Sequence, residues 1–394
     1  MSNVYTFLAP NMKMPDVLLK NVGEFLLITM PGSPMRQPTL DKLSELWGSN
    51  NKLGPLKIKN EPNEFLSKEH FRDVEGGRLT WYRTAAIEKA VMKHLPDIEK
   101  ERPSSKLSKG QTVRLVLDSL KLIPMKERAS KLTATQKRAQ KKIGDLKFPE
   151  DAAPEVSLKV HKLSAVMVYP PPQAEFAADL VLEDLWDARF GGVTYGGDGV
   201  EHNHRVDGQF HATLDLEAGQ APDEPEFGGD ATWQLEHDRY GTFFTKGGGL
   251  IKATTKFIRT ITDDPMDSSM IAESVPTSKS SEDAEYLAEI VRAFGAPVDG
   301  PMVVITDSTS NGMVARRKAS GQRIKHAMRR WTGIHKRVAK RLITVVHVGD
   351  ASMPADFLTK WVPKKKVEDS VEYLTNRYNK VHHPRDPENP CFGK

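Results

Sequence analysis

The sequence has almost no cysteine and no long apolar run. Its one cysteine, Cys391, lies near the C-terminus, which excludes a disulfide framework and a cysteine-rich zinc module. No stretch approaches the ~18 consecutive apolar residues of a membrane-spanning helix, and Met1 to Met14 lacks the basic and apolar regions of a signal peptide. These absences predict a soluble intracellular protein, in the cytoplasm or nucleus, whose metal ions are held by oxygen or imidazole.

The charges are segregated along a chain that is long enough for two or three domains. Eleven acids and one arginine lie between Asp198 and Asp238, whereas eleven lysines and arginines and no acid lie between Arg316 and Arg341. Such a basic stretch attracts phosphate polyanions through counterion release, although a solvated surface is the commoner role of a charge run.

The second half of the chain alternates strand and helix patterns. Residues 240–246 and 250–261 flank Gly247-Gly-Gly249 and predict a hairpin, and a helix is expected from about Met270 to Phe294. The apolar runs Met302 to Thr306 and Leu342 to Val346 predict two buried strands. Between them, one face of a basic helix is lined by Ile324, Met328, Trp331, Ile334 or His335, and Val338.

Four acids fall at informative places in this array. Asp230 precedes the hairpin, Glu273 opens the long helix, Asp307 ends a buried strand, and Asp356 begins a last short helix. Ends of central strands and the helix starts above them converge in a mixed sheet, so these carboxylates can share one pocket. Oxygen-only clusters select Mg²⁺ or Mn²⁺, and two such ions support phosphodiester cleavage. The alternative role of Asp307 is to cap a helix that begins at Ser308.

Several short motifs surround these acids. They are Asp230-Ala-Thr-Trp233, Ser268-Ser-Met-Ile-Ala-Glu273, Thr306-Asp307-Ser308, Lys325-His326 and, most specific, Ala355-Asp-Phe-Leu-Thr-Lys360. With this order, residues 227–360 resemble the ribonuclease H domain of copia-type long-terminal-repeat retrotransposon polyproteins. The resemblance implies an α/β (α+β) fold, a ribonuclease H-like five-stranded mixed sheet with flanking helices. It also implies that Asp230, Glu273, Asp307 and Asp356 are catalytic residues that hold Mg²⁺ or Mn²⁺.

A second segment, Ser281-Glu-Asp-Ala-Glu285-Tyr, also resembles the family's pattern around its second acid. A helix from Glu285 to Phe294 spans roughly 14 Å and one from Glu273 roughly 32 Å, at about 1.5 Å per residue, and only the longer one crosses a five-stranded sheet. Helix length therefore favours Glu273. Pro276, however, is typical of a first helical turn, which favours a helix that begins after Glu273.

A fainter resemblance to the end of a reverse transcriptase lies upstream. The family's paired aspartates are replaced by Gly23 and Glu24, and the fingers and the earlier catalytic aspartate are expected to precede Met1. We therefore expect no polymerase activity. The implied organisation is a truncated palm and thumb remnant (1–100), a basic polar linker or helical segment (101–160), a connection helix and acidic loop (161–224), the ribonuclease H-like domain (225–365) and a C-terminal tail (366–394).

The predicted function is metal-dependent hydrolysis of the RNA strand of an RNA–DNA hybrid, with no membrane partner. The residues expected to bind the nucleic acid are Arg316, Arg317, Lys318, Arg323, Lys325, His326, Arg329, Arg330, Lys336 and Arg337. The alternative is a decayed retroelement protein that binds nucleic acid without catalysis. The losses at the polymerase motif favour this alternative, whereas the presence of all four acids favours the enzyme.

Overall fold

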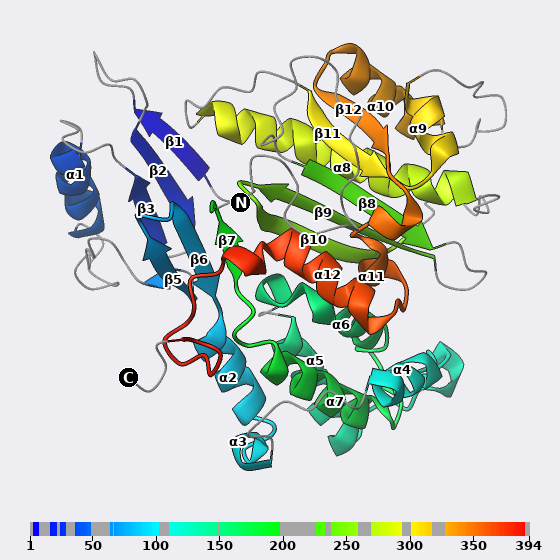
Figure 1. Ribbon diagram of the computed structural model, residues 1–394. Coiled ribbons are helices and arrows are strands. Elements are labelled where there is room, and N and C mark those ends of the chain that lie inside the picture. Colours follow the sequence, from blue (N-terminus) through cyan, green and yellow to red (C-terminus); the bar gives the residue numbers. More distant parts are fainter. Residues whose placement is uncertain are drawn as a thin grey trace.

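The computed structural model describes residues 3–7, 16–21, 24–28, 36–48, 64–65, 67–101, 110–147, 150–197, 226–232, 238–258, 269–293, 301–316 and 328–390. Strands in these ranges form sheets of three, four and five strands (Figure 1). Most of the predicted acidic stretch, residues 198–225, lies outside the described residues, as does the first part of the predicted basic segment, residues 317–327.

The predicted five-stranded mixed sheet is confirmed. Its strands are β8 (Glu226–Thr232), β9 (Arg239–Lys246), β10 (Gly249–Phe257), β11 (Met302–Thr306) and β12 (Ile343–His347). They lie in the order β10-β9-β8-β11-β12, with β8, β9 and β10 antiparallel and β8, β11 and β12 parallel. The apolar strand β11 is buried along its whole length between β8 and β12, whereas β12 forms the edge of the sheet.

Helices cover both faces of this sheet (Figure 1). They are α8 (Ser269–Ala293), α9 (Thr309–Ala315), α10 (Met328–Ala339), α11 (Asp356–Thr359) and α12 (Lys364–Thr375). On one face, α8 and α10 pack Leu287 and Trp331 against Phe227 and Val304. On the other face, α11 and α12 pack Leu358 and Leu374 against apolar strand residues. The predicted core position of Trp331 is confirmed, since its side chain is fully buried.

Gly229 of β8 allows α8 to lie close to the sheet, whereas Gly228 makes room for the Ile305 and Phe243 side chains of the neighbouring strands. A Cβ atom at Gly229 would come within 2.6 Å of Pro276 Cβ, and one at Gly228 within 2.5 Å of Ile305. Pro276 lies inside α8, so the expectation that it marks the first helical turn is wrong. The carbonyl of Glu273 instead accepts hydrogen bonds from the Thr277 hydroxyl (3.1 Å) and the Asn311 amide (3.1 Å), which ties α9 to α8 at this turn.

A second unit combines a four-stranded antiparallel sheet with helices. Its strands, in sheet order, are β4 (Glu64–Phe65), β5 (Lys68–Asp73), β6 (Arg78–Tyr82) and β7 (Val193–Tyr195). Its helices are α2 (Thr84–Met92), α3 (Ile98–Glu101), α4 (Gly110–Ser119), α5 (Ala134–Leu146), α6 (Ser157–Ala165) and α7 (Ala174–Asp187). Ile143 and Leu146 of α5 are fully buried against α7 residues such as Leu182 and Leu185. The segment expected as linker or exposed helix thus contributes to a core.

The C-terminal segment connects the two units. Buried Val371 and Leu374 of α12 belong to the core of the five-stranded sheet. Beyond α12, Asn376 donates a hydrogen bond to the carbonyl of Gly196 (2.9 Å), and the Tyr82 hydroxyl donates one to the carbonyl of Val381 (2.6 Å). Residues expected to form a tail therefore pack against β6 and the end of β7.

The remaining elements are shorter or lie near the N-terminus. Strands β1 (Asn3–Phe7), β2 (Asp16–Asn21) and β3 (Glu24–Ile28) form an antiparallel sheet, and α1 spans Arg36–Gly48. The 3₁₀ helices are η1 (Met125–Glu127), η2 (Glu150–Ala152), η3 (Pro154–Val156), η6 (Asp350–Ser352) and η7 (Arg377–Asn379). None of the described helices combines the length and apolar composition needed to cross a membrane.

Candidate active site

The four acids singled out in the sequence come from four parts of the chain and lie around the C-terminal ends of strands β8 and β11. Asp230 lies on β8, Glu273 on α8, Asp307 directly after β11, and Asp356 at the start of α11. One carboxylate oxygen from each of Asp230, Glu273 and Asp307 lies within 4.8 Å of the other two. We call these three residues the Glu273 group.

A fifth carboxylate, which the sequence analysis missed, joins the cluster. Asp350, in η6, lies with Asp307 and Asp356 in a second set whose oxygens are within 4.8 Å of one another. We call these three the Asp356 group, and Asp307 belongs to both. The Asp350 side chain is 79% exposed, whereas that of Asp356 is 1% exposed. The only sequence signal for Asp350 is the Gly349-Asp dipeptide, which is typical of any turn.

The Glu273 group is buried with few hydrogen-bond partners. Glu273 Oε1 accepts a hydrogen bond from the backbone N–H of Ala231 (3.1 Å), and Glu273 Oε2 is buried with no hydrogen-bond partner among the described residues. Burial and the nearby Asp230 and Asp307 carboxylates raise the pKa of Glu273 to about 9. Burial also raises the pKa of Asp230 to about 7, with Asp356 and Asp307 adding to the shift and Lys360 opposing it. The raised pKa values indicate that Lys360 compensates only part of the negative charge of this group.

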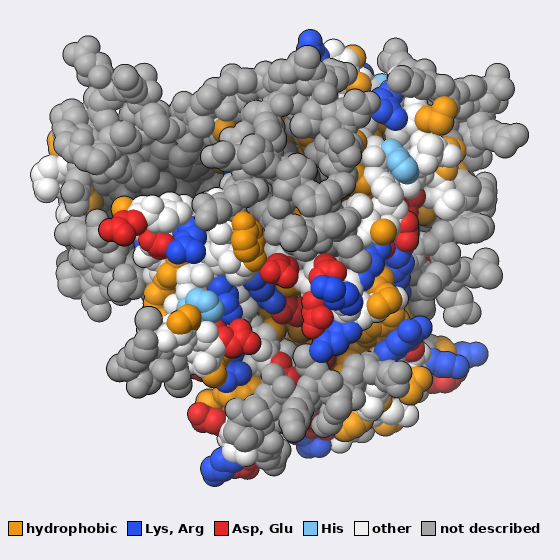
Figure 2. Space-filling view, viewed as in Figure 1, with side chains coloured by type: hydrophobic (Ala, Val, Ile, Leu, Met, Phe, Trp, Pro, Cys, Tyr) orange, Lys and Arg blue, Asp and Glu red, His pale blue; other side chains and the backbone are white. Residues whose placement is uncertain are grey.

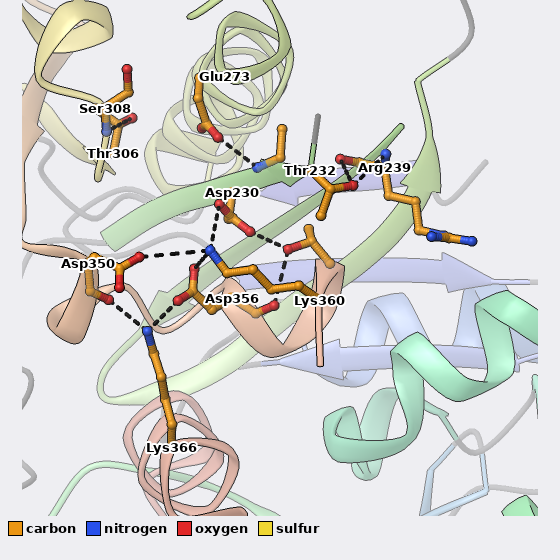
Figure 3. A network of polar contacts seen from close by, with 12 residues as sticks. Asp230, Thr232, Arg239, Glu273, Thr306, Ser308, Asp350, Asp356, Lys360 and Lys366 are labelled. Atoms are coloured by element: carbon orange, nitrogen blue, oxygen red, sulfur yellow. Dashed lines mark hydrogen bonds and ion pairs between the residues drawn. The ribbon is translucent and has the colours of Figure 1, made fainter. Parts of the chain in front are cut away.

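Two lysines offset part of the negative charge of the Asp356 group. The ammonium of Lys360 lies 3.0 Å from Asp356 Oδ1 and 3.8 Å from both Asp230 Oδ1 and Asp350 Oδ1 (Figure 3). Lys366, on α12, pairs with Asp356 Oδ2 and donates to the carbonyl of Asp350 (2.7 Å). Burial lowers the pKa of Lys360, but the surrounding carboxylates more than offset this and raise it overall. Figure 2 shows the resulting mixture of acidic and basic side chains over α11 and α12.

The helix after Asp307 is capped by its neighbour. The Ser308 side chain accepts a hydrogen bond from the backbone N–H of Asn311 (3.2 Å) and is the N-cap of α9. The alternative capping role of Asp307 is therefore wrong, because the next residue performs it. Burial, Asp356 and other nearby acids raise the pKa of Asp307, although Lys360 opposes them. The Asp307 carboxylate is thus available to a ligand at the sheet edge.

The donor set fits a hard divalent cation. All of the carboxylates offer oxygen, which Mg²⁺ and Mn²⁺ prefer, and no sulfur or imidazole belongs to either group. The buried, unpartnered Glu273 Oε2 is the kind of atom that a cation satisfies, since an unpaired buried carboxylate oxygen is costly. Glu273, Asp230 and Asp307 are the residues that would hold such an ion, beside Lys360, whose ammonium lies 3.8 Å from Asp230 Oδ1.

The rival second acid lies elsewhere. Glu285 Oε2 pairs with the Arg337 guanidinium of α10 at 2.8 Å. Glu285 therefore joins α8 to α10 and does not belong to either carboxylate group among the described residues.

The predicted basic face is described only in part. Arg316, Arg329 and Lys336 are exposed, Arg330 is half-buried, and Arg337 is paired with Glu285. Arg317, Lys318, Arg323, Lys325 and His326 lie outside the described residues. The described part of α10 thus has an apolar face on the core and a basic face outward, as the helical spacing predicts.

Comparisons with known proteins identify solved structures but no family. The ribonuclease H1 of the archaeon Halobacterium salinarum NRC-1 is 11% identical, covers 32% of this chain and 87% of its own, and has a TM-score of 0.26. LC11 ribonuclease H1, isolated from compost by a metagenomic approach, is 15% identical, covers 34% of this chain and 92% of its own, and has a TM-score of 0.28. The foamy viral protease-reverse transcriptase in complex with an RNA/DNA hybrid is 14% identical, covers 38% of this chain and 21% of its own, and has a TM-score of 0.25. No protein-family model and no curated protein matches the chain.

The five-stranded unit has a ribonuclease H-like fold. Its five-stranded mixed sheet with flanking helices is the fold expected from the sequence, and its strand order is β10-β9-β8-β11-β12.

Proposed function

We propose that this chain hydrolyses the RNA strand of RNA–DNA hybrids in a reaction that depends on Mg²⁺ or Mn²⁺. The observation that carries the proposal is the convergence of Asp230, Glu273, Asp307 and Asp356 from four separate elements. Carboxylates placed this close repel one another when ionised, and a bound cation, like the nearby lysines, would offset that repulsion. When bound, the metal ion activates water and stabilises the leaving oxygen of a phosphodiester.

The residues of the chain would have separate roles around that ion. Asp230, Glu273 and Asp307 hold the cation, and Asp356 is paired with Lys360 and Lys366. The basic face of α10, with Arg329, Arg330 and Lys336, grips the nucleic-acid backbone without reading its sequence. Arg317, Lys318, Arg323, Lys325 and His326 are proposed to extend this surface.

The motif resemblance supports an origin in a copia-type retrotransposon polyprotein. In this proposal, residues 1–100 derive from a polymerase palm and thumb and no longer polymerise, because Gly23 and Glu24 stand where the family has paired aspartates. A glycine offers no side-chain ligand to a metal ion.

Cleavage of a hybrid with a labelled RNA strand tests the proposal. We expect Mg²⁺-dependent cutting of that strand and no cutting of double-stranded DNA. Asp307→Asn should abolish cutting while sparing binding, and Asp97→Asn, the same change at a site that is 63% exposed, should leave it intact. Cleavage that survives Asp307→Asn would refute the metal assignment.

One observation favours the second candidate function, nucleic-acid binding without catalysis. The Lys360 ammonium already lies within 4 Å of Asp230, Asp350 and Asp356, where it supplies positive charge that a second metal ion would otherwise supply. Under this alternative, the protein binds the hybrid but cuts nothing at any Mg²⁺ or Mn²⁺ concentration, and these ions leave its melting midpoint unchanged.

A further inference from the structure

A pocket of about 450 Å³ opens beside the carboxylate cluster. Its walls come from both structural units: Arg114 and Lys162 lie on α4 and α6, and Arg239 lies at the start of β9. Phe257 and Trp361 add aromatic surfaces. The volume falls within the ~300–1,000 Å³ typical of small-molecule sites.

The pocket carries more positive than negative charge. Among its lining residues, Asp118 is the one acid, and it is already engaged. Asp118 pairs with Lys162 (2.8 Å) and Arg114 (3.6 Å) and accepts a hydrogen bond from Trp361 Nε1 (3.0 Å). Asp118 thus fixes the Trp361 ring and neutralises only part of the charge, so the pocket suits an anion.

Arg239 is a buried cation in the pocket with an unsatisfied hydrogen-bond donor. It is 8% exposed, and its Nε atom is buried with no hydrogen-bond partner among the described residues. Its guanidinium carbon lies 5.1 Å from the centroid of the Phe257 ring. Among the described residues it forms no ion pair with a carboxylate, although the charge of Asp118 acts on it from beyond ion-pair distance. A buried guanidinium without an anion is costly, and a phosphate satisfies its planar donors in a bidentate manner.

The pocket and the carboxylate cluster share a wall. Thr359 and Lys360 line the pocket, yet the Thr359 hydroxyl donates to Asp230 Oδ2 and the Lys360 ammonium pairs with Asp356 (Figure 3). A strand whose phosphodiester lies on the carboxylates therefore has its neighbouring nucleotide at the pocket.

We propose that this pocket binds one nucleotide of the RNA strand, adjacent to the phosphodiester that the cluster cuts, with its phosphate on Arg239 and its base against Trp361. The inference rests on the proposed function, because it takes the cut strand to be the one that passes the cluster. Bases splayed out of a strand commonly stack on aromatic rings and guanidinium planes, which this pocket supplies together.

Binding of a fluorescent RNA–DNA hybrid tests the inference separately from catalysis. Full-length Asp307→Asn protein without divalent metal is compared with the same protein carrying Arg239→Gln or, as a matched control, Arg72→Gln on an exposed position of β5. We expect Arg239→Gln to weaken binding about tenfold to a hundredfold and to reduce the slope of log affinity against log salt by about one. Its melting midpoint should not fall, because the guanidinium has no carboxylate partner to lose.

Photo-crosslinking identifies the strand and the ring. A 4-thiouridine placed beside the cut position in the RNA is expected to crosslink to Trp361 or Phe257, whereas 4-thiothymidine opposite it in the DNA is not. Arg239→Lys, which keeps the charge but loses the planar fork, should restore most of the salt slope and provides a folded comparison if Arg239→Gln unfolds.

The outcomes separate the two proposals. Equal affinities of Arg239→Gln and Arg72→Gln, or pocket crosslinks from the DNA strand alone, would overturn the pocket assignment even if the wild-type protein cuts hybrids. Conversely, RNA crosslinks to Trp361 with loss of binding in Arg239→Gln would support the pocket even if no cleavage is found.

Discussion

The two carboxylate groups share Asp307 but obtain their positive charge differently. In the Asp356 group, Lys360 and Lys366 form ion pairs with Asp356, so the protein itself supplies positive charge there. In the Glu273 group, Glu273 has one backbone N–H as a partner and one oxygen with none, and its pKa is raised to about 9. The comparison predicts that a bound metal ion would act mainly on the β8–α8 side of the site.

The largest expected effect comes from changing Glu273, whose Oε2 is buried without a hydrogen-bond partner among the described residues. Glu273→Gln should reduce hybrid cleavage by at least about a hundredfold, since even residues that only support metal ligands contribute roughly 10–100-fold. Asp350→Asn should cost less than about tenfold, because Asp350 is exposed and lies beside lysines. Steady-state cleavage rates at several Mg²⁺ concentrations measure both variants, and equal losses would contradict the comparison.

The next effect is a pH dependence of stability in the metal-free protein. The folded-state pKa of Glu273 is about 9 against an ordinary value of 4.5, and that of Asp230 is about 7 against 3.8. The folded protein therefore keeps protons that the unfolded chain releases, and its free energy of unfolding falls as pH rises from about 4.5 to 9. We expect a loss on the order of a few kcal/mol in chemical denaturation.

Glu273→Gln is the control for that pH dependence. A neutral side chain at this position removes the largest contribution, so the decline above pH 7 should flatten. Saturating Mg²⁺ should flatten it in the wild-type protein as well, because the cation stabilises the ionised carboxylates. A decline unchanged in the variant would assign the titration to other groups.

A smaller effect is expected from the lysines of the Asp356 group. Lys366→Met removes one cation from Asp356, whose side chain is 1% exposed, and should lower the free energy of unfolding by roughly 1–3 kcal/mol. Lys360 remains paired and limits the loss. Lys364→Met, the same change two residues away in an exposed pair with Glu368, should cost under about 0.5 kcal/mol. Equal urea midpoints for the two variants would contradict the importance of the buried pair.

The smallest effect concerns the basic face of α10. Arg329→Gln should weaken hybrid binding less than tenfold and reduce the salt slope by about one, because Arg329 is exposed. Arg337→Gln should leave the salt slope nearly unchanged, since that guanidinium already pairs with Glu285. Titration of a labelled hybrid at several salt concentrations distinguishes the two arginines.

Much of the five-stranded unit could be predicted because its strands are apolar and its acids follow recognisable motifs. Met302 to Thr306 is an uninterrupted apolar run, and the Gly247-Gly-Gly249 turn marks the hairpin. Strand β8 gave a weaker signal, because Gly228 and Gly229 replace the β-branched residues that indicate a strand. Gly229 is required by the close approach of Pro276, and Gly228 by the Ile305 and Phe243 side chains.

Other features could not be predicted because their cause is tertiary. In α5, Ala139, Ile143 and Leu146 form a narrow apolar stripe among lysines, so the segment has the composition of a linker. Asp350 and Lys366 lie in polar surroundings, and only the folded chain brings them to Asp356. The role of the acids themselves stays a prediction, because proximity alone does not establish catalysis.

The hydrogen bond from Tyr82 to Val381 has a consequence for how the protein is made. It joins residues 299 positions apart, and a ribosome that adds about 5–20 residues per second needs roughly 15–60 s to synthesise the intervening chain. During that interval β6 lacks its C-terminal partner, and the charge on Asp356 lacks Lys366 until α12 emerges. The nascent chain therefore cannot complete the carboxylate site until Lys366 has been synthesised, after β6 and α10.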